Sequence, residues 1–311
     1  MNELSIAVII PCYNEEITIK QTIESCRTVL PTASIYVYDN NSSDHTVQIA
    51  KSTSAIVRTE KYQGKGSVVR RMFADVEADI YVMIDGDDTY DIANTPELID
   101  ILISNNLDML NGRRVTNVKS AYRQGHRLGN RLLSYAVYAI FNSRFDDLLS
   151  GYRIFSRRFV KTFPATSKGF EIETELTVHA MELRMPVAEY DVNYRDRPEG
   201  SVSKLKTYQD GFRILKTIAA LVRDERPLAF FGGAFFLLVS LSLFLAWPVL
   251  TTYFETGLVP RLPTAILSTG LTLLGFLSLA CGLILDTVTL GRREFKRMVY
   301  LNYSAPSECK A

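Results

Sequence analysis

The stretch of sequence that decides the fold is Ile80-Tyr81-Val82-Met83-Ile84-Asp85-Gly86-Asp87-Asp88. Its apolar half predicts a buried strand of a parallel sheet, and its acidic half predicts a loop at the carboxyl end of that strand. Asp85 and Asp87 could hold a divalent cation against a diphosphate, because Mg²⁺ needs few protein ligands when phosphate oxygens complete its shell. The alternative is an acidic turn without a ligand, since Asp and Gly favour turns.

Strand-like and helix-like patterns alternate over the first hundred residues. Strands are expected at residues 5–10, 35–38, 55–59 and 80–84, with a further strand at 108–110. The segments between the first four, at 17–30, 46–52 and 66–76, have the spacing of helices. This alternation predicts βαβ units, and therefore a mainly parallel sheet with helices on both faces.

Polar clusters follow three of the first four strands, at residues 13–16, 39–44 and 85–88. The carboxyl ends of parallel strands meet at one edge of a sheet, where ligands bind. We therefore expect the three clusters to lie together. Asp39 could accept hydrogen bonds from a nucleobase or a ribose, or it could shape a turn; Asp44 is better placed to cap the following helix.

Lys65 stands between two glycines, just ahead of an expected helix. The segment lacks the spacing of a P-loop. Glycines nevertheless let the backbone approach a ligand closely, and a helix N-terminus favours anions. Lys65 could therefore reach a phosphate.

The composition gives no sign of nucleic acid binding, of a disulfide framework or of a zinc framework. The chain has 311 residues, 35 of them basic and 34 acidic, with a net charge of +1. Its four cysteines, Cys12, Cys26, Cys281 and Cys309, show no CxxC spacing, which suits a reducing cytoplasm. The amino terminus leads directly into a strand, so no cleavable signal peptide is expected.

Two long stretches without a charged residue lie near the carboxyl terminus, at residues 227–254 and 262–285. Each exceeds the roughly 20 apolar residues that cross a bilayer. They predict transmembrane helices at about 228–250 and 264–285, with a buried hairpin of a soluble core as the alternative. Basic residues on both outer flanks place those flanks in the cytoplasm and the short connecting loop outside. They are Arg223, Arg226, Arg292, Arg293, Lys296 and Arg297.

Two further segments, near residues 119–144 and 205–224, combine basic and apolar residues at helical spacing. Each could be an ordinary helix with one face on the core, or an amphipathic helix at the membrane interface. The expected organisation is a domain over 1–225, two spans within 226–290 and a basic cytoplasmic tail over 291–311.

The ordered set of motifs resembles family 2 glycosyltransferases of the GT-A fold, an α/β, Rossmann-like fold with a mainly parallel sheet. The later motifs and the two spans make the chain similar to polyprenyl-phosphate glycosyltransferases. That group includes dolichyl-phosphate mannose synthases and bacterial undecaprenyl-phosphate sugar transferases. The resemblance covers essentially the whole chain. The motifs that carry it are residues 8–16, 39–44, 64–66, 85–87, 147–153 and 197–204.

The resemblance implies a donor site and a metal site at the edge of the sheet. Asp85 and Asp87 match the pair that binds Mg²⁺ or Mn²⁺ with the donor diphosphate. Thr89 stands where many relatives have a Gln metal ligand. The residues implied to bind the nucleotide are Pro11, Tyr13, Glu15, Asp39, Lys65 and Asp85.

The resemblance also implies catalytic residues and an acceptor-phosphate site. Asp147 matches an acid near the sugar, Arg153 matches a basic residue near the phosphates, and Asp87 completes the catalytic set. An orienting role for Asp147 is favoured over a base, because a lipid phosphate is already an anionic nucleophile. The basic residues implied for the acceptor phosphate are Arg114, Arg123, Arg127, Arg131 and Lys204, with Arg197 as a further candidate and Asn130 nearby.

The implied reaction is an inverting, metal-dependent transfer of a sugar from a nucleotide-sugar donor, preferably a UDP-sugar, to a membrane polyprenyl phosphate. Its product would serve the assembly of cell-envelope glycans or glycoconjugates. A GDP-mannose-dependent polyprenyl-phosphate mannose synthase is the alternative. A processive polysaccharide synthase, a metal-dependent nucleotidyltransferase and a non-catalytic membrane adaptor are less favoured.

The resemblance and the spans together imply a multi-pass protein of the cytoplasmic membrane, with the catalytic domain and both termini in the cytoplasm. The expected partners are the donor, the polyprenyl phosphate and the lipid bilayer, with no nucleic acid. A homo-oligomer is also expected, and a tetramer is one option. A flippase is a further candidate partner.

Overall fold

The computed structural model describes residues 4–115, 134–135, 137–141, 145–165, 171–195 and 207–308. The chain forms two compact units. One comprises Met1–Phe212 together with Lys296–Ala311, and the other comprises Arg213–Phe295.

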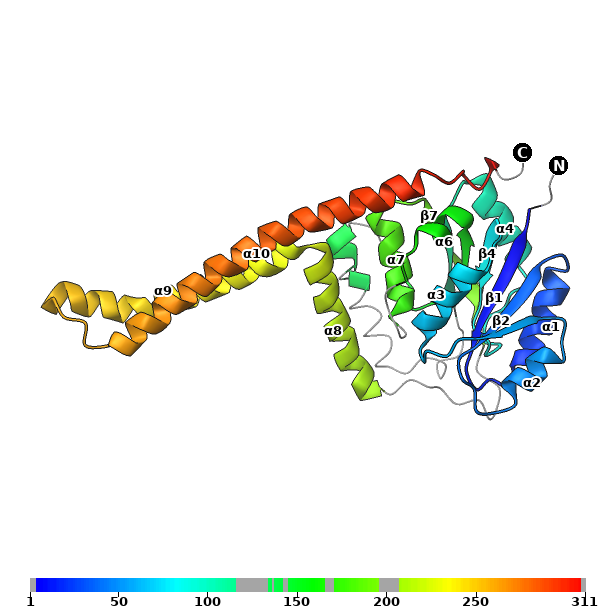
Figure 1. Ribbon diagram of the computed structural model, residues 1–311, viewed down its shortest axis with the longest axis horizontal. Coiled ribbons are helices and arrows are strands. Elements are labelled where there is room, and N and C mark those ends of the chain that lie inside the picture. The colour runs from blue at the N-terminus through cyan, green and yellow to red at the C-terminus, as the bar shows by residue number, and fades with distance from the viewer. Residues whose placement is uncertain are drawn as a thin grey trace. The chain divides into compact units, whose positions relative to one another are not determined.

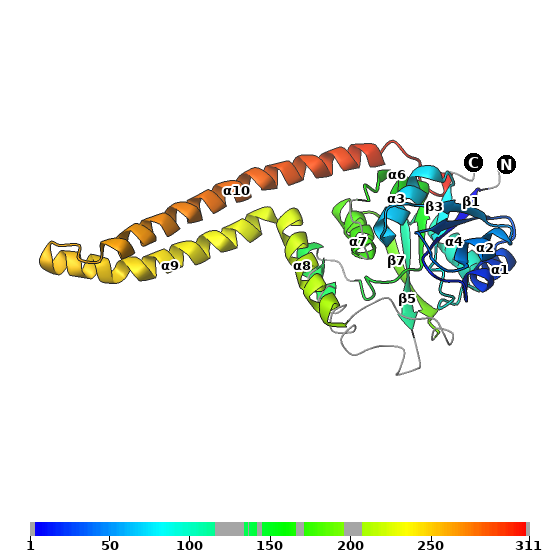
Figure 2. The ribbon, with the colours of Figure 1, turned by 60° about the horizontal axis from the view of Figure 1, so that its bottom comes forward.

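The first unit is built on a seven-stranded sheet with the order β3-β2-β1-β4-β6-β5-β7. All neighbouring strands are parallel except β6, which runs antiparallel to both β4 and β5. The predicted α/β fold with a mainly parallel sheet is therefore confirmed (Figure 2). The strands are β1 (Ile6–Cys12), β2 (Ser34–Asp39), β3 (Ile56–Thr59), β4 (Ile80–Met83), β5 (Met109–Val115), β6 (Arg153–Ser156) and β7 (Val187–Asn193).

Helices cover both faces of this sheet, as Figure 1 shows for α1 and α2 on one side and α3 and α7 on the other. Val8 and Ile10 of β1 belong to the same apolar cluster as Ile23 and Leu98 from the helices of the first face. On the opposite face Phe73 makes edge-on ring contacts with Tyr81 and Phe155. The first face carries α1 (Ile19–Val29), α2 (Thr46–Lys51) and α4 (Thr95–Ser104); the second carries α3 (Lys65–Asp75), α6 (Arg157–Thr162) and α7 (Ile172–Glu182).

The strand register brings several loops to one edge. Cys12 pairs with Asp39, so β1 and β2 end side by side. Arg153 pairs with both Met83 and Asn111. Because β6 runs the opposite way, its first residue lies where β4 and β5 end. The residues just before β6 therefore join the loops that follow the parallel strands.

Several elements differ from the sequence prediction. β5 continues to Val115, beyond the expected end at Leu110, because its pairing with β7 extends over its whole length. The helices α4, α6 and α7 and the strands β6 and β7 were not predicted. Of the segment near 119–144, residues 134–135 and 137–141 are helical and most of the rest lies outside the described residues. The helix expected at 205–224 is α8 (Thr207–Glu225).

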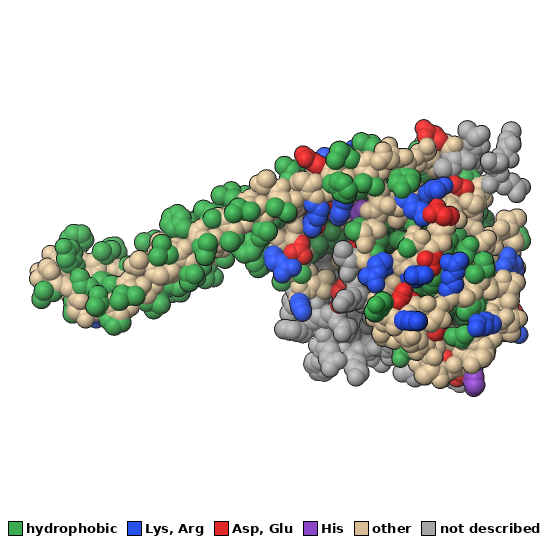
Figure 3. All heavy atoms as spheres, in the orientation of Figure 1, with side chains coloured by type: hydrophobic (Ala, Val, Ile, Leu, Met, Phe, Trp, Pro, Cys, Tyr) green, Lys and Arg blue, Asp and Glu red, His purple; other side chains and the backbone are tan. Residues whose placement is uncertain are grey.

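The second unit contains two long apolar helices, α9 (Pro227–Thr256) and most of α10 (Leu262–Tyr300). Both are long and apolar enough to cross a membrane, with mean hydropathies of 2.3 and 2.0. Hydrophobic side chains cover their visible surface in Figure 3. Within the unit Ser242 donates a hydrogen bond of 2.6 Å to the carbonyl of Ser268.

Small side chains allow these two helices to pack closely. A side chain on Gly275 would meet Val239 at 3.0 Å, and one on Gly282 would meet Phe231 at the same distance. The buried residues of α10 are Ser268, Gly275, Gly282 and Thr289, each seven positions after the last. Small residues at such spacing let two apolar helices approach without large side chains between them.

The end of α10 belongs to the first unit. Residues 291–311 were expected to form a basic tail, but the helix continues to Tyr300. Lys296 forms an ion pair of 2.6 Å with the buried Glu182 of α7. The Tyr300 hydroxyl donates to Asp108 Oδ2 at 2.8 Å, and its ring lies 4.9 Å from the Arg158 guanidinium. These contacts explain why the expected tail is ordered against the sheet domain.

Replacing Tyr300 with Phe tests this attachment. Asp108 is fully buried and also accepts hydrogen bonds from Ser156 and Arg158. A hydrogen bond to a charged group contributes about 1.5–3 kcal/mol, and we expect Tyr300→Phe to lower the free energy of unfolding by that amount. The measurement is denaturant unfolding of the detergent-solubilised chain.

Tyr303→Phe is the matched control, because the Tyr303 hydroxyl has no hydrogen-bond partner among the residues that the structure describes. It should leave the unfolding free energy nearly unchanged. Equal effects of the two substitutions would contradict the docking of Tyr300 on Asp108.

Candidate active site

The candidate site lies at the edge of the sheet where β1, β2, β4 and β5 end. Asp85 and Asp87 follow β4, Asp39 ends β2, and Arg114 lies near the end of β5. The loop ahead of β6 adds Asp147. The predicted convergence of polar clusters on one edge is therefore confirmed as a feature of the fold.

Asp85 is held between a lysine and a glycine. Its Oδ1 accepts a hydrogen bond from Lys65 Nζ at 2.6 Å. A Cβ atom on Gly151 would lie 2.0 Å from Asp85 Oδ2, so the backbone of the 147–152 loop packs directly on this carboxylate. The Gly151 amide donates to the Tyr90 hydroxyl at 2.8 Å, which fixes the loop in this place.

Lys65 contacts a second carboxylate, that of Glu173 on α7, at 2.7 Å. Burial alone would lower the pKa of Lys65, but Asp85 and Glu173 raise it above its usual range. Sequence reasoning missed Glu173, which lies far from Asp85 along the chain. The sequence shows only an alternation of acidic residues here, at Glu171, Glu173 and Glu175. This pattern does not tell which of the acids is buried and which is solvated.

Asp87 is nearly buried and is oriented by its neighbour Thr89. The Thr89 hydroxyl donates to Asp87 Oδ1 at 2.7 Å. Asp88 has a positive φ of 53° and turns the chain between them. Thr89 therefore positions Asp87, and its service as a metal ligand stays a prediction.

The loops after β1 and β2 are bonded to each other. Asn14 Oδ1 accepts from the Ser43 amide at 2.8 Å, and the Glu15 amide donates to Thr46 Oγ1 at 2.8 Å. Tyr13 is 36% exposed beside this contact, whereas Asp39 and Glu15 are buried. Pro11 is buried within β1. These residues, which were predicted to bind the nucleotide, thus lie at one edge of the sheet. Tyr13 is the exposed aromatic side chain among them.

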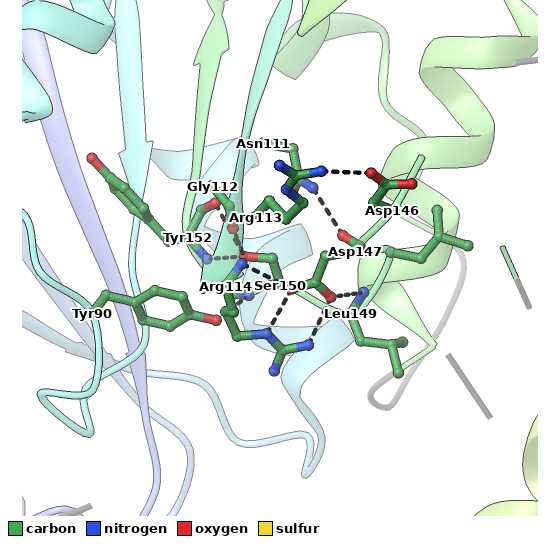
Figure 4. A network of polar contacts seen from close by, with 12 residues as sticks. Tyr90, Asn111, Gly112, Arg113, Arg114, Asp146, Asp147, Leu149, Ser150 and Tyr152 are labelled. Carbon is green, nitrogen blue, oxygen red and sulfur yellow. Dashed lines mark hydrogen bonds and ion pairs between the residues drawn. The ribbon is translucent and has the colours of Figure 1, made fainter. Parts of the chain in front are cut away.

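Arg114 and Asp147 form a bidentate ion pair (Figure 4). Arg114 Nε and Nη2 donate to the two carboxylate oxygens, both at 2.7 Å. Burial raises the pKa of Asp147, but hydrogen bonds and charge from Arg114 outweigh burial and hold it below its usual range. The guanidinium also lies 5.6 Å from the Tyr194 ring centroid. Two residues predicted for different roles are therefore direct partners.

Glu189 of β7 supports the loop that carries Asp147. Its carboxylate accepts from the amides of Asp146 at 2.7 Å and Asp147 at 3.2 Å. Asn111 donates to the same carboxylate and to the Asp147 carbonyl, each at 2.8 Å. Glu189 was not predicted, because nothing near it in sequence carries a recognisable motif.

Arg153 does not lie where the sequence analysis placed it. It was expected near the phosphates, but it is fully buried and donates to the carbonyls of Leu148 and Ser150, at 2.8 and 3.2 Å. Burial lowers the pKa of Arg153 to about 10, against the opposing charges of Glu173 and Asp147. Arg153 therefore holds the loop before β6, and its side chain is not exposed at the sheet edge.

Other predicted residues lie outside the described part of the chain. They are Arg123, Arg127, Asn130, Arg131, Arg197 and Lys204.

Asp85 and Asp87 are the carboxylates that fit a divalent cation. Within the described ranges no group of three or more His, Cys, Asp and Glu residues is arranged to hold a metal. A pair of hard oxygen donors next to an anionic ligand is sufficient for Mg²⁺, because phosphate and water oxygens fill the remaining positions. The donor set therefore fits a metal that arrives with a diphosphate.

Comparison with known proteins identifies the family. Residues 7–163 match the sequence profile of glycosyl transferase family 2. The chain belongs to this family. Glycosyltransferase AglJ of Haloferax volcanii is 30% identical over 297 residues, which cover 94% of this chain and 97% of the relative. An uncharacterised protein of Shigella flexneri is 54% identical over 155 residues, which cover 50% of this chain and 95% of the relative.

Two other similar proteins widen the comparison of this family 2 glycosyltransferase. The dolichyl-phosphate hexose transferase of Haloferax volcanii is 25% identical over 221 residues, covering 71% of this chain and 95% of the relative. The crystal structure of glucosyl-3-phosphoglycerate synthase from Mycobacterium tuberculosis with Mn²⁺ and UDP-glucose has a TM-score of 0.57. It is 22% identical and covers 70% of this chain and 78% of that one, so it supports the fold. The predicted GT-A fold and family are confirmed.

Gly151→Ala tests the packing of the 147–152 loop on Asp85. A methyl group cannot be accommodated 2.0 Å from the carboxylate, so Asp85 must move. A displacement of about 1 Å in a catalytic site can reduce the rate roughly 10²-fold, and we expect a loss of that order in sugar transfer without global unfolding.

Gly86→Ala is the steric control, because its added methyl group would meet Cys12 and Ile19 at an ordinary 3.4 Å. It should cost much less activity. The readouts are the transfer rate and the thermal midpoint, and a fully active Gly151→Ala chain would show that the loop does not fix Asp85.

Proposed function

We propose that this glycosyltransferase transfers a sugar, with inversion, from a nucleotide-sugar donor to a membrane polyprenyl phosphate, using Mg²⁺ or Mn²⁺. A UDP-sugar is the favoured donor and GDP-mannose is the alternative. The observation that carries the proposal is the combination of two features in one chain. The edge with Asp85, Asp87 and Arg114 can bind anions through a metal and a guanidinium, and the same chain has two helices apolar enough for a bilayer.

The donor side rests on Asp85 and Asp87. These carboxylates would hold the divalent cation, which supplies a positive charge that neutralises the diphosphate and stabilises the departing nucleotide. The structural relative from Mycobacterium tuberculosis was crystallised with Mn²⁺ and UDP-glucose together, which supports this choice of ligands for a GT-A fold. Tyr13, Glu15 and Asp39 would then bind the nucleoside at the ends of β1 and β2, with Pro11 beneath them.

The acceptor side rests on Arg114 and on the apolar helices. A polyprenyl phosphate brings its own charged nucleophile, so the protein must mainly neutralise two anions and align them. Arg114 is a planar cation suited to bidentate binding of phosphate. The similarity to a dolichyl-phosphate hexose transferase along 71% of this chain supports a lipid phosphate as the acceptor.

Asp147 acts in this proposal as an orienting group. Its pKa lies below the usual range because Arg114 outweighs the effect of burial, so it is a poor proton acceptor. As an ionised partner it sets the direction of the Arg114 guanidinium. In-line attack by the phosphate oxygen on the anomeric carbon inverts the sugar, and the departing diphosphate takes the bonding electrons.

The two apolar helices would place this chain in the cytoplasmic membrane as a multi-pass protein. The flanking basic residues favour a cytoplasmic site and an outer loop at residues 255–261. α8 combines basic and apolar residues at helical spacing, and it would lie at the headgroup level of the bilayer. Homo-oligomerisation and a flippase partner stay predictions.

The direct test is transfer to undecaprenyl phosphate by the full-length chain in membranes, screened with radiolabelled nucleotide sugars. One UDP-sugar should give a lipid-linked, β-configured product that needs Mg²⁺ or Mn²⁺. Incorporation only from GDP-mannose would favour the alternative donor. Transfer that persists in excess EDTA would remove the metal from the proposal.

Asp87→Asn should reduce this transfer by on the order of 10²–10³, the usual effect of removing one electrostatic stabiliser. Asp88→Asn is the matched control. Asp88 has the positive φ that Asn tolerates well, and it carries no proposed ligand role. The two variants should therefore differ strongly in rate, and similar rates would contradict a specific role for Asp87.

Acceptor length provides a test of the membrane's part. The full-length chain should transfer sugar to a short, water-soluble prenyl phosphate even when no bilayer is present. Transfer to the long-chain acceptor should require a bilayer. Truncation after Asp224 is a poor substitute, because it also removes Lys296 and Tyr300 from the sheet domain. Equal dependence on the bilayer for both acceptors would argue that the helices serve folding.

A further inference from the structure

Lys65 stands between two carboxylates from distant parts of the chain. Its Nζ lies 2.6 Å from Asp85 Oδ1 and 2.7 Å from Glu173 Oε1. The Lys65 and Glu173 side chains are 11% and 5% exposed, whereas that of Asp85 is 27% exposed. Asp85 thus faces the edge of the sheet, and Glu173 lies behind the lysine in the interior.

Glu173 has an unused acceptor. Its Oε2 is buried and has no hydrogen-bond partner among the residues that the structure describes. Buried carboxylate oxygens are rarely left in this state, and each case calls for an explanation. An ammonium group has three donors, so Lys65 could bond to both oxygens of Glu173 at once.

Both oxygens of Asp85 are closely approached. Lys65 engages Oδ1, and the Gly151 backbone packs beside Oδ2. A divalent cation that coordinates Asp85 must therefore compete with the ammonium for the same carboxylate. Of these two neighbours Lys65 is the one that can move, because Gly151 is backbone held by Tyr90.

We propose that Glu173 is a positioning residue of the cation site, which accepts the Lys65 ammonium when Asp85 coordinates the metal. This inference rests on the proposed function, since it concerns the same donor site. The orphaned Oε2 provides the acceptor that replaces Asp85. Lys65 then stays beside the diphosphate as a cation without blocking the carboxylate.

Loss of Glu173 should leave Lys65 with Asp85 as its only anionic partner among these three residues. The ammonium would then oppose the incoming metal through direct competition and charge repulsion. Replacing a residue that orients a metal ligand commonly weakens metal affinity by about 10- to 100-fold. We expect an effect of this size on Mn²⁺ binding.

The experiment measures Mn²⁺ binding to the purified full-length chain, with saturating UDP, by electron paramagnetic resonance. Glu173→Gln should weaken Mn²⁺ affinity about 10- to 100-fold. Combining it with Lys65→Met removes the competing ammonium and should raise Mn²⁺ affinity above that of Glu173→Gln. Because Lys65 is also a proposed diphosphate contact, UDP is brought to saturation separately for each variant. Glu175→Gln is the control for charge on α7, because residues two apart on a helix do not share a face; its affinity should stay unchanged.

The double variant separates positioning from a structural role. If Glu173 only supported the fold, removing Lys65 as well would not recover the affinity. The double variant lacks both the Lys65 ammonium and the Glu173 carboxylate, so it leaves neither of these charges buried without the other. It therefore also tests the proposal if Glu173→Gln alone proves unstable. A double variant as weak as the single one, or a single variant with normal affinity, overturns the inference. Absence of Mn²⁺ binding by the unsubstituted chain would instead overturn the metal-dependent function itself.

Discussion

The structure depends on keeping several carboxylates together at one edge of a sheet. Asp39, Asp85, Asp87 and Asp147 all lie where strands of the same domain end or begin, and three of them are nearly buried. Buried anions are costly unless they are paired and hydrogen-bonded. The fold meets this requirement at Asp147 with Arg114, while Asp39 accepts from the Ser42 amide and Asp87 from the Thr89 hydroxyl. Lys65 at the start of α3 pairs with the more exposed Asp85.

These pairings determine which residues can face a substrate. Asp147 and Arg114 are partners, so a phosphate that binds Arg114 must share it with Asp147 or displace it. Lys65 is shared between Asp85 and Glu173 in the same way. Acidic side chains of the site are thus already engaged in ion pairs with Lys65 and Arg114. A metal and a diphosphate at this edge would therefore compete with ion pairs that are already present.

The sequence predicted the sheet edge well because its signals are local. An apolar run followed at once by acids, as at residues 80–88, identifies both a buried strand and the loop that it presents. Glu173 and Glu189 lack such a signal, since their roles come from tertiary contacts with Lys65 and with the Asp147 amide. Arg153 was misplaced for a related reason. It begins a strand that is buried throughout, and an arginine beside a motif gives no indication of whether its side chain points in or out.

The carboxyl-terminal region shows another limit of sequence reasoning. The apolar stretch correctly predicted a long helix, but the end of that helix is set by polar contacts of Lys296 and Tyr300, not by hydropathy. Within the second unit, Glu225 similarly binds both Arg292 and Arg293, at 2.7 and 2.9 Å. The basic residues that predicted the membrane orientation therefore also form ion pairs that hold the fold together.

The most direct test of the central claim is a crystal structure of the full-length chain with Mn²⁺ and UDP, with the metal located by its anomalous scattering. We expect one Mn²⁺ bound by Asp85 and Asp87 and by the diphosphate, with the Lys65 ammonium moved from Asp85 toward Glu173. Mn²⁺ bound at other residues, or a diphosphate bound away from Asp85 and Asp87, would contradict it.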